Sequence, residues 1–509
     1  MQIARALISV SNKAGAVELT KGLLELGIEV LSTGGTAKFL KENKIKVKEI
    51  SEVTGFPEIL DGRVKSLHPK VHGGILAVRG NKKHMQELEK LGIQPIDLVV
   101  VNIYPFEETI ERTGAIEEVI ENIDIGGPAM LRSAAKNYRD VAVVVDPGDY
   151  GEVLRELGEN DRRLGERTME RLAVKAFSCT ARLDTMISNY LMEKFGIDEL
   201  PDIMNLSYKK IQDLRYGENP HQKAAVYRAR RSRGIVGAKQ LHGKQLSFNN
   251  ILDLDVAWEV VREFEEPTAV VVKHGNPCGV ASAKSILEAY KMAYACDPAS
   301  AYGSIVAVNG KIDEAVAKEI TSTFIEAVIS PGYQKAALDV LKQKNDLRVM
   351  ELLETADRKL QLREVTGGAL VQEKDALLLR PSEIKVVTKK RPSEREMEDL
   401  IFAWKVVKHV KSNAILVAKE KQAIGVGAGQ MSRVDSTEIA IKKAGDRVRG
   451  AVLASDGFVS FEDSVHKAAD AGITAIIQPG GSIHDAEVIQ AADKHNIAMV
   501  ITRVRHFKH

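Results

Sequence analysis

Adjacent lysine and histidine side chains, Lys273 and His274, form the part of the sequence best suited to moving a proton beside a positive charge. They end the apolar run TAVVV and begin a turn that contains Gly275 and Asn276. Successive side chains of a strand point to opposite faces, so both groups can face one substrate only if the turn begins there. The pair is therefore a candidate for general base and electrostatic chemistry at a strand end.

The same loop allows a second interpretation, a zinc site. Pro277 and Cys278 resemble the PC element of zinc-dependent deaminases. No second cysteine follows Cys278 at CxxC spacing, however, and none of the 12 histidines belongs to an HxE triplet. We therefore predict that Cys278 is a small buried residue and that the protein uses no zinc. A metal-dependent deaminase stays an alternative that a zinc assay would test.

Two loops near the N-terminus have the composition of a phosphate site. Residues 33–36 read TGGT, follow the strand-like run IEVLS and open a helix, where N–H groups and hydroxyls can converge on a phosphate. Ser11, Asn12 and Lys13 follow the first predicted strand, and the C-terminal ends of parallel strands share one edge of a sheet. A plain glycine turn with a helix cap is the structural alternative for TGGT.

Three further segments carry candidate polar groups. The basic segment GRVKSLHP spans residues 62–69, Tyr104 follows the apolar run DLVVV, and Asp124 precedes a glycine pair and a helix that carries Lys136. Each segment also has a structural interpretation: a solvated loop for the basic segment, packing for Tyr104 and a helix N-cap for Asp124. Both interpretations stay open for each segment at this point.

Composition limits the possible partners. Lys and Arg number 72 and Asp and Glu number 70, so the formal charge of +2 provides no broad field to attract nucleic acid or an anionic membrane. Three cysteines are too few for a disulfide framework and fit a reducing compartment. No apolar run approaches the roughly 20 residues that a membrane-spanning helix needs. We therefore expect a soluble, cytoplasmic protein that binds small molecules.

The predicted helices and strands must position these groups. Up to about residue 150, short apolar strands alternate with helical stretches, which predicts a doubly wound, parallel α/β sheet. Residues 155–195 have helical periodicity, and Pro201 follows them. We therefore predict that the first domain ends at residue 198.

Beyond this boundary the sequence contains an internal repeat. TAVVVK resembles NAILVAK, GSIVAVNG resembles GAVLASDG, and AVISPG resembles AIIQPG, with offsets of 146 to 148 residues. We predict two copies of one α/β unit joined by the charged residues 385–400, although chance similarity among apolar strands is an alternative. The predicted domains are residues 1–198, 199–390 and 391–509.

Taken together, seven motifs resemble the bifunctional purine biosynthesis family. In chain order they are GRVKSLHP, NIYPF, DIGGPAMLRSAAKN, LRYGENPHQ, KHGNPCG, GVGAGQMSR and the terminal RHFKH. That family joins an aminoimidazole carboxamide ribonucleotide (AICAR) transformylase to an inosine monophosphate (IMP) cyclohydrolase. The resemblance implies a methylglyoxal synthase-like N-terminal domain, followed by a tandem pair of zinc-free, cytidine deaminase-like α/β units.

The resemblance also implies site residues. The cyclohydrolase nucleotide would contact Ser11, Asn12, Lys13, Thr33, Gly34, Gly35, Thr36, Arg63, Val64, Lys65, Ser66, Val101, Asn102, Asp124 and Ile125. The transformylase nucleotide would contact Arg215, Tyr216, Lys273, His274, Gly303, Glu326, Asn413, Arg433, Phe458 and Arg505, and the folate would lie near Asp463 and Ser482. Glu326 stands where animal members carry an aspartate, which implies a longer or indirect contact. The second copy also lacks a helical insertion between Arg433 and Ser455.

The implied chemistry has two steps. A formyl group passes from 10-formyltetrahydrofolate to the weakly nucleophilic amine of AICAR, with His274 as general base and Lys273 stabilising the oxyanion. The carboxamide nitrogen then closes the ring, with Asp124 and Lys136 as a proton-transfer pair and Tyr104 and Lys65 polarising the reacting oxygen. The family further implies a homodimer. A non-catalytic nucleotide sensor built on the same phosphate loops is the alternative.

Overall fold

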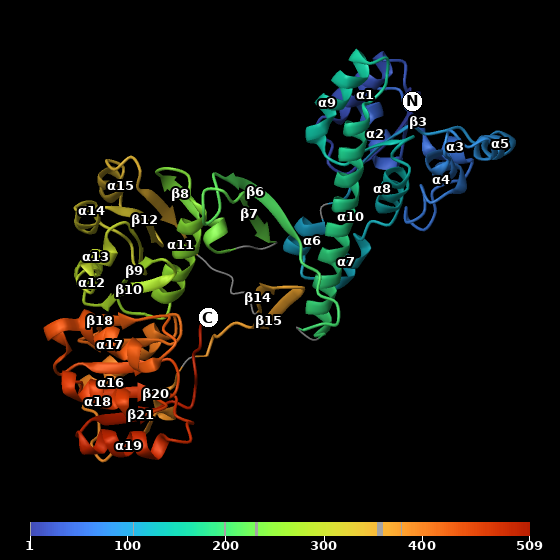
Figure 1. Ribbon diagram of the computed structural model, residues 1–509. Helices are drawn as coiled ribbons and strands as arrows, with labels where there is room; N and C mark the ends of the chain where they lie inside the picture. The colour runs from blue at the N-terminus through green and yellow to red at the C-terminus, as the bar shows by residue number, and fades with distance from the viewer. Residues whose placement is uncertain (1, 105, 198–199, 230–232, 354–359, 378) are drawn as a thin grey trace. The chain divides into compact units, whose positions relative to one another are not determined.

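The computed structural model describes residues 2–104, 106–197, 200–229, 233–353, 360–377 and 379–509 (Figure 1). Contacts within the chain define two compact units, Met1–Ser207 and Tyr208–His509. The predicted boundary at residues 198 and 199 lies outside the described residues. The predicted domains 199–390 and 391–509 share one continuous sheet within the second unit, and their separation stays a prediction. Of the helices that the structure describes, none is both long and apolar enough to cross a membrane.

The first unit is built on a five-stranded parallel sheet. In spatial order its strands are β3 (Lys48–Glu49), β2 (Glu29–Ser32), β1 (Arg5–Val10), β4 (Leu98–Asn102) and β5 (Ala142–Val144). The chain leaves β1 towards β2 on one side and later returns to β4 on the other. Ligands of open parallel sheets bind at such a reversal, outside the carboxyl ends of the strands. The parallel α/β prediction for this part is confirmed.

Helices cover both faces of this sheet. The described helices of the first unit are α1 (Ala16–Glu25), α2 (Gly34–Glu42), α3 (Ile50–Thr54), α4 (Pro69–Leu76), α5 (Lys82–Lys90), α6 (Phe106–Arg112), α7 (Ile116–Glu121), α8 (Gly126–Lys136), α9 (Tyr150–Glu159) and α10 (Glu166–Phe195). Of these, α6 and α7 pack with α10 in a separate small core. Leu19 of α1 and Val153 of α9 pack in one core, and Val71 of α4 and Leu131 of α8 pack in the core on the other face. The buried, β-branched strands fit a sheet enclosed on both sides.

The second unit contains a 12-stranded sheet. In spatial order its strands are β16 (Lys385–Val386), β21 (Ala498–Ile501), β20 (Ala475–Gln478), β19 (Val452–Ser455), β17 (Ile415–Lys419), β18 (Gln422–Gly427), β10 (Asn276–Ser282), β9 (Thr268–Lys273), β11 (Ser304–Val308), β12 (Ile325–Ser330), β13 (Arg348–Glu351) and β8 (Lys239–His242). The order β10-β9-β11-β12-β13 repeats as β18-β17-β19-β20-β21. The copies meet where β10 and β18 pair antiparallel, with Ala281 opposite Gln422. The predicted internal repeat is therefore present in the strand topology.

Helices again lie on both faces of this sheet. They are α11 (Phe248–Val261), α12 (Ile286–Tyr294), α13 (Pro298–Ala301), α14 (Glu314–Thr321), α15 (Lys335–Leu341), α16 (Glu394–Val407), α17 (Arg433–Ala444), α18 (Asp463–Ala471) and α19 (Asp485–Lys494). Residues of α11 and α16 share one core, whereas α12, α14 and α15, and separately α17, α18 and α19, pack in two cores on the opposite side. α16 begins after Ser393, which forms a capping box with Glu396.

Two hairpins lie outside this large sheet. β6 (Tyr208–Leu214) pairs with β7 (Ala224–Ala229), and β14 (Leu360–Val365) pairs with β15 (Gly368–Glu373). The LRYGENPHQ motif begins at the last residue of β6 and forms the loop between β6 and β7.

Candidate active sites

In the first unit, the loops after β1 and β4 are joined at the point where the strand order reverses. Asn102 Oδ1 accepts hydrogen bonds from the N–H groups of Ser11 (2.5 Å) and Asn12 (2.9 Å). Asn102 Nδ2 donates to the Asn12 carbonyl at 2.9 Å. The predicted loop 11–13 and the predicted Asn102 therefore come together at the carboxyl edge, where a ligand of this sheet is expected.

The TGGT segment lies beside these loops. Thr36 Oγ1 accepts from the Val10 N–H (3.0 Å) and from Lys13 Nζ (2.9 Å), and the Thr33 and Ser9 hydroxyls are 2.7 Å apart. Thr33 is the N-cap of α2 but makes no side-chain cap, so the opening N–H groups of this helix suit an anion. Burial, followed by the charge of Lys65, lowers the pKa of the Lys13 ammonium.

Asp124 occupies a close-fitting position before the first turn of α8. Its Oδ1 accepts the Gly127 N–H at 2.9 Å, and a Cβ on Gly127 would lie 2.3 Å from its Oδ2, so a larger residue there would displace the Asp124 carboxylate. The Ser66 side chain also packs closely against the start of α8, since a Cβ on Gly126 would lie 2.7 Å from Ser66 Oγ. Burial raises the pKa of the Asp124 carboxyl, while the Gly127 N–H and the Lys65 charge oppose this rise.

The remaining predicted cyclohydrolase residues differ in accessibility. Tyr104 is 37% exposed and Ile125 is 59% exposed, so both side chains can meet a ligand. Val101 is buried in β4, which leaves only its backbone for such a contact. Arg63 pairs with Glu121 at the surface, with Nε and Oε1 3.1 Å apart, and Val64 forms an isolated bridge with Ile59.

Within one chain, Lys136 does not lie beside Asp124, its predicted partner in proton transfer. Asp124 precedes the first turn of α8, whereas Lys136 is exposed at its last position. Ten residue steps at 1.5 Å separate the ends of this helix by about 15 Å, more than the two side chains can bridge. Within one chain, Lys65 is the cation that acts electrostatically on Asp124.

In the second unit, one edge of the 12-stranded sheet collects most of the predicted transformylase residues. Several pairs of neighbouring strands in this sheet are antiparallel, including β9 and β11, β17 and β19, and β10 and β18. Some strands therefore end at this edge and others start there. Those that end there are β9, β18, β19, β20 and β21, and those that start there include β10, β11, β12 and β17. The predicted residues at or near these strand ends are Lys273, His274, Phe458, Ser482 and Arg505, and those at or just before the strand starts are Gly303, Glu326 and Asn413. Three strand spacings place the end of β9 about 14 Å from the start of β17.

The turn between β9 and β10 begins at Lys273, as the sequence required. Lys273 Nζ donates to the Tyr302 carbonyl at 2.7 Å, next to Gly303, whose φ is 71°. His274 is exposed and has a φ of 53°. Asn276 Oδ1 accepts the Lys411 N–H at 3.0 Å, which ties this turn to the segment before Asn413 within the same chain.

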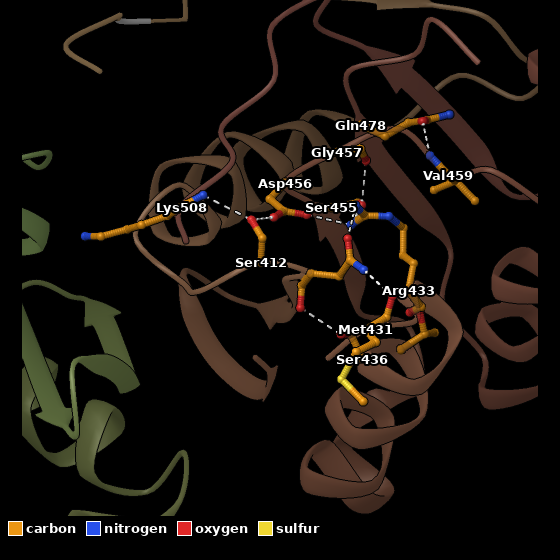
Figure 2. Close-up of polar contacts among 12 residues, drawn as sticks. Ser412, Met431, Arg433, Ser436, Ser455, Asp456, Gly457, Val459, Gln478 and Lys508 are labelled. Carbon is orange, nitrogen blue, oxygen red and sulfur yellow. Dashed lines mark hydrogen bonds and ion pairs between the residues drawn. The ribbon is translucent and has the colours of Figure 1, made fainter. Parts of the chain in front are cut away.

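Arg433 is held by a buried polar network at the start of α17 (Figure 2). Its Nη1 donates to Asp456 Oδ1 (2.5 Å) and Ser455 Oγ (2.8 Å), and its Nη2 donates to Asn413 Oδ1 (2.8 Å). The Asp456 carboxylate is 0% exposed and also accepts from the Ser412 hydroxyl. The predicted residues Arg433 and Asn413 therefore contact each other directly, and Ser455 and Asp456 also hold the Arg433 guanidinium in place.

The C-terminal segment belongs to this network. The Ser412 N–H donates to the Lys508 carbonyl (2.9 Å), and the Lys508 N–H donates to Ser412 Oγ (3.0 Å). His506 is 2% exposed, with Nδ1 2.6 Å from Asp375 Oδ2. The Arg505 guanidinium lies over the Phe507 ring, 4.3 Å from its centroid. The tail is therefore fixed, whereas its polar composition alone is typical of a frayed end.

The predicted folate residues lie on neighbouring loops. Asp463 opens α18 and accepts the Ser464 N–H at 2.7 Å, whereas Ser482 Oγ accepts the His484 N–H at 3.1 Å. The rings of Phe461 and His484 connect the two loops, with centroids 5.4 Å apart. Phe458 is half-buried on the first of these loops.

Helix α11 contacts the remaining predicted transformylase residues or the loops that carry them. This role of the helix was not identified from the sequence. Asn249 Nδ2 donates to the Glu218 carbonyl in the loop that carries Arg215 and Tyr216 (3.4 Å). Asn250 Nδ2 donates to Glu326 Oε2 (2.9 Å), whose carboxylate also pairs with Arg348 (3.3 Å). Asp253 accepts N–H groups of the 273–276 turn. A signal was available: the polar residues 249, 250 and 253 are spaced three and four residues apart, which places them on one side of the helix.

A cavity of about 190 Å³ opens beside the 273–276 turn. Its lining includes Lys273, His274, Asp297 and Lys443, with Cys278 on the wall. Cys278 is half-buried against the core rather than fully buried as predicted, and burial raises the pKa of its thiol to about 12. Among the residues that the structure describes, no three His, Cys, Asp or Glu side chains gather into a set that could hold a metal ion.

Comparison with known proteins agrees with this architecture. The family model described as MGS-like domain matches residues 15–129, and the model described as AICARFT/IMPCHase bienzyme matches residues 134–443. Proteins named bifunctional purine biosynthesis protein PurH are similar over nearly their full length. Those from Bacillus cereus (strain AH820) and Thermoanaerobacter sp. (strain X514) are 56% and 54% identical, each with 99% of both chains covered. The protein from Acetivibrio thermocellus is 54% identical, with both chains covered completely. The chain belongs to the AICARFT/IMPCHase bienzyme family.

Proposed function

We propose that each sheet edge described above carries one of two consecutive reactions in purine synthesis. The chain is a bifunctional AICAR formyltransferase and IMP cyclohydrolase. Formyl transfer is assigned to the second unit and ring closure to the first. The observation that carries this assignment is the clustering of the two predicted residue sets on two different sheets. The non-catalytic sensor alternative finds no support in the comparisons.

For formyl transfer, the donor is a folate, and we assign it as 10-formyltetrahydrofolate. His274 removes the proton from the AICAR amine as it attacks the formyl carbon, and Lys273 stabilises the oxyanion of the tetrahedral intermediate. Collapse of this intermediate breaks the bond to the folate nitrogen, which takes up the proton held by His274, and releases tetrahydrofolate. Arg433 and Asn413 bind the nucleotide further along the edge, and their fixed geometry supports this role.

For ring closure, the carboxamide nitrogen attacks the new formyl carbon and water leaves. Asp124 is the group that moves a proton, because its burial is suited to a carboxyl that exchanges protons nearer neutral pH. Lys65 and Tyr104 polarise the reacting oxygen. Lys136 receives no role within one chain because it lies at the far end of α8.

Three finer assignments accompany this function. Asp463 and Ser482 contact the folate, supported by their position on adjoining loops of the same sheet edge. The repeated halves of the second unit are cytidine deaminase-like, as the family resemblance implies, and their identical strand order supports the duplication. The protein acts as a homodimer in the cytoplasm, and its three free cysteines fit a reducing compartment.

Direct product analysis tests the function. Purified protein is incubated with AICAR and 10-formyltetrahydrofolate, and the nucleotides are separated by anion-exchange chromatography. We expect IMP and tetrahydrofolate in equal amounts, and IMP from formyl-AICAR without any folate. Tight binding of AICAR with no product from either substrate would contradict the proposal and favour a sensor.

A further inference from the structure

The two hairpin turns of the repeat are fixed in the same way. In the first copy, Asp253 of α11 accepts the N–H groups of His274 (3.2 Å) and Gly275 (2.6 Å). In the second copy, Asp399 of α16 accepts the N–H groups of Glu420 (2.9 Å) and Lys421 (2.7 Å). A carboxylate from the preceding helix therefore holds two successive N–H groups at both turns.

Backbone conformation explains why such a carboxylate is needed. His274 and Gly275 have φ values of 53° and 72°, and Glu420 and Lys421 have 54° and 53°. Two-residue hairpin turns with positive φ at both positions favour Asn-Gly or Asp-Gly, because other side chains are strained there. Neither turn has that sequence. The bidentate carboxylate supplies the hydrogen bonds that keep His274 in this unfavourable region.

The lysines of the two turns are also equivalent. Lys273 Nζ donates to the Tyr302 carbonyl at 2.7 Å, and Lys419 Nζ donates to the Arg449 carbonyl at 2.8 Å. The lysine contact and the aspartate contact are thus properties of the repeated unit. What differs is the residue after the lysine: His274 in the first copy, and in the second Glu420, which pairs with Arg395.

We propose that Asp253 is a positioning residue for formyl transfer, because it fixes the turn that directs the His274 imidazole. This inference rests on the proposed role of His274 as general base. Asp253 contacts the backbone of the turn and needs no contact with substrate. Asp399 makes the same backbone contacts in a turn at the opposite edge of the sheet, away from every residue assigned to formyl transfer.

The test compares Asp253→Asn with Asp399→Asn in the full-length protein. An amide offers one acceptor oxygen and turns its NH₂ towards the second N–H, so each variant disturbs its own turn equally. A displacement of about 1 Å at a catalytic group can cost up to about 100-fold, so we expect Asp253→Asn to lower the kcat of formyl transfer by about 10- to 100-fold. The KM for AICAR and the rate of ring closure should stay near wild type. Asp399→Asn should keep the wild-type kcat with a similar fall in melting temperature.

A double-variant cycle asks whether Asp253 acts through His274. The combination Asp253→Asn with His274→Ala should transfer formyl no more slowly than His274→Ala alone. If the fold-losses of the two single variants multiplied in the double variant, the inference would be overturned. Equal kcat values for Asp253→Asn and Asp399→Asn would also overturn it. Full activity of His274→Ala would instead overturn the proposed function. If the amide variants do not fold, Asp253→Ser and Asp399→Ser, which keep one acceptor in a smaller side chain, provide the same comparison.

Discussion

His274→Ala should lower formyl transfer by about 100- to 10,000-fold, the usual contribution of a positioned general base. The amine of AICAR is a weak nucleophile, so its attack requires removal of a proton during bond formation. His274 is exposed at the start of the turn and lines the cavity beside Lys273, where it can reach a bound substrate. Steady-state rates with AICAR and 10-formyltetrahydrofolate provide the measurement. Ring closure of formyl-AICAR is the internal control and should be unchanged.

His274→Gln separates catalysis from binding. Glutamine can still donate and accept hydrogen bonds but cannot take up the proton at neutral pH. If His274 is the base, the Gln variant should lose kcat nearly as severely as the Ala variant. A near-normal kcat with a raised KM would show instead that the imidazole contacts the nucleotide and has no catalytic role.

Asp124→Asn should remove ring closure to a similar degree, by about 100- to 10,000-fold, and leave formyl transfer intact. Asparagine is as good an acceptor for the Gly127 N–H as aspartate, so the start of α8 should be preserved. Asp313→Asn is a matched control, because Asp313 accepts the Val316 N–H at the start of α14 in the same manner. It should change neither rate. If Asp124→Asn closed the ring at the wild-type rate, the Asp124 carboxyl would serve only as a helix cap.

The pH dependence gives an independent test of Asp124. Burial raises the pKa of its carboxyl, so the ionised form is lost at a higher pH than for an ordinary aspartate. If the ionised carboxyl accepts the proton, ring closure should fall as pH decreases through this raised pKa. The acid limb should therefore lie above pH 4, the approximate value for an unperturbed aspartate. A ring-closure rate that is flat down to pH 4 would contradict the assignment.

The fold was largely predictable because local pattern and tertiary environment agree. Runs such as DLVVVNI form fully buried strands, and burial on both faces is what an uninterrupted β-branched run indicates. The offset of 146 to 148 residues between repeated segments corresponds to an observed repetition of strand order.

The supporting residues of the sites were not predictable in the same way. Asp456 is fully buried beneath Arg433, and Asp253 reaches a turn 21 residues further along the chain. The spacing of polar residues in α11 marks Asp253 as a candidate, but the group that each aspartate contacts depends on tertiary packing that no local pattern encodes. The predicted pairing of Asp124 with Lys136 does not form within one chain, because a helix that begins at Gly126 and ends at Lys136 holds its ends apart.

A mixture of two inactive variants tests the central claim that one chain carries two separate active sites. His274→Ala alone should not convert AICAR, and Asp124→Asn alone should stop at formyl-AICAR. An equal mixture of the two purified proteins, given AICAR and 10-formyltetrahydrofolate, should produce IMP after a lag in which formyl-AICAR accumulates and then diffuses to the intact ring-closing site. Formyl-AICAR that accumulates in the mixture without any IMP would contradict the account.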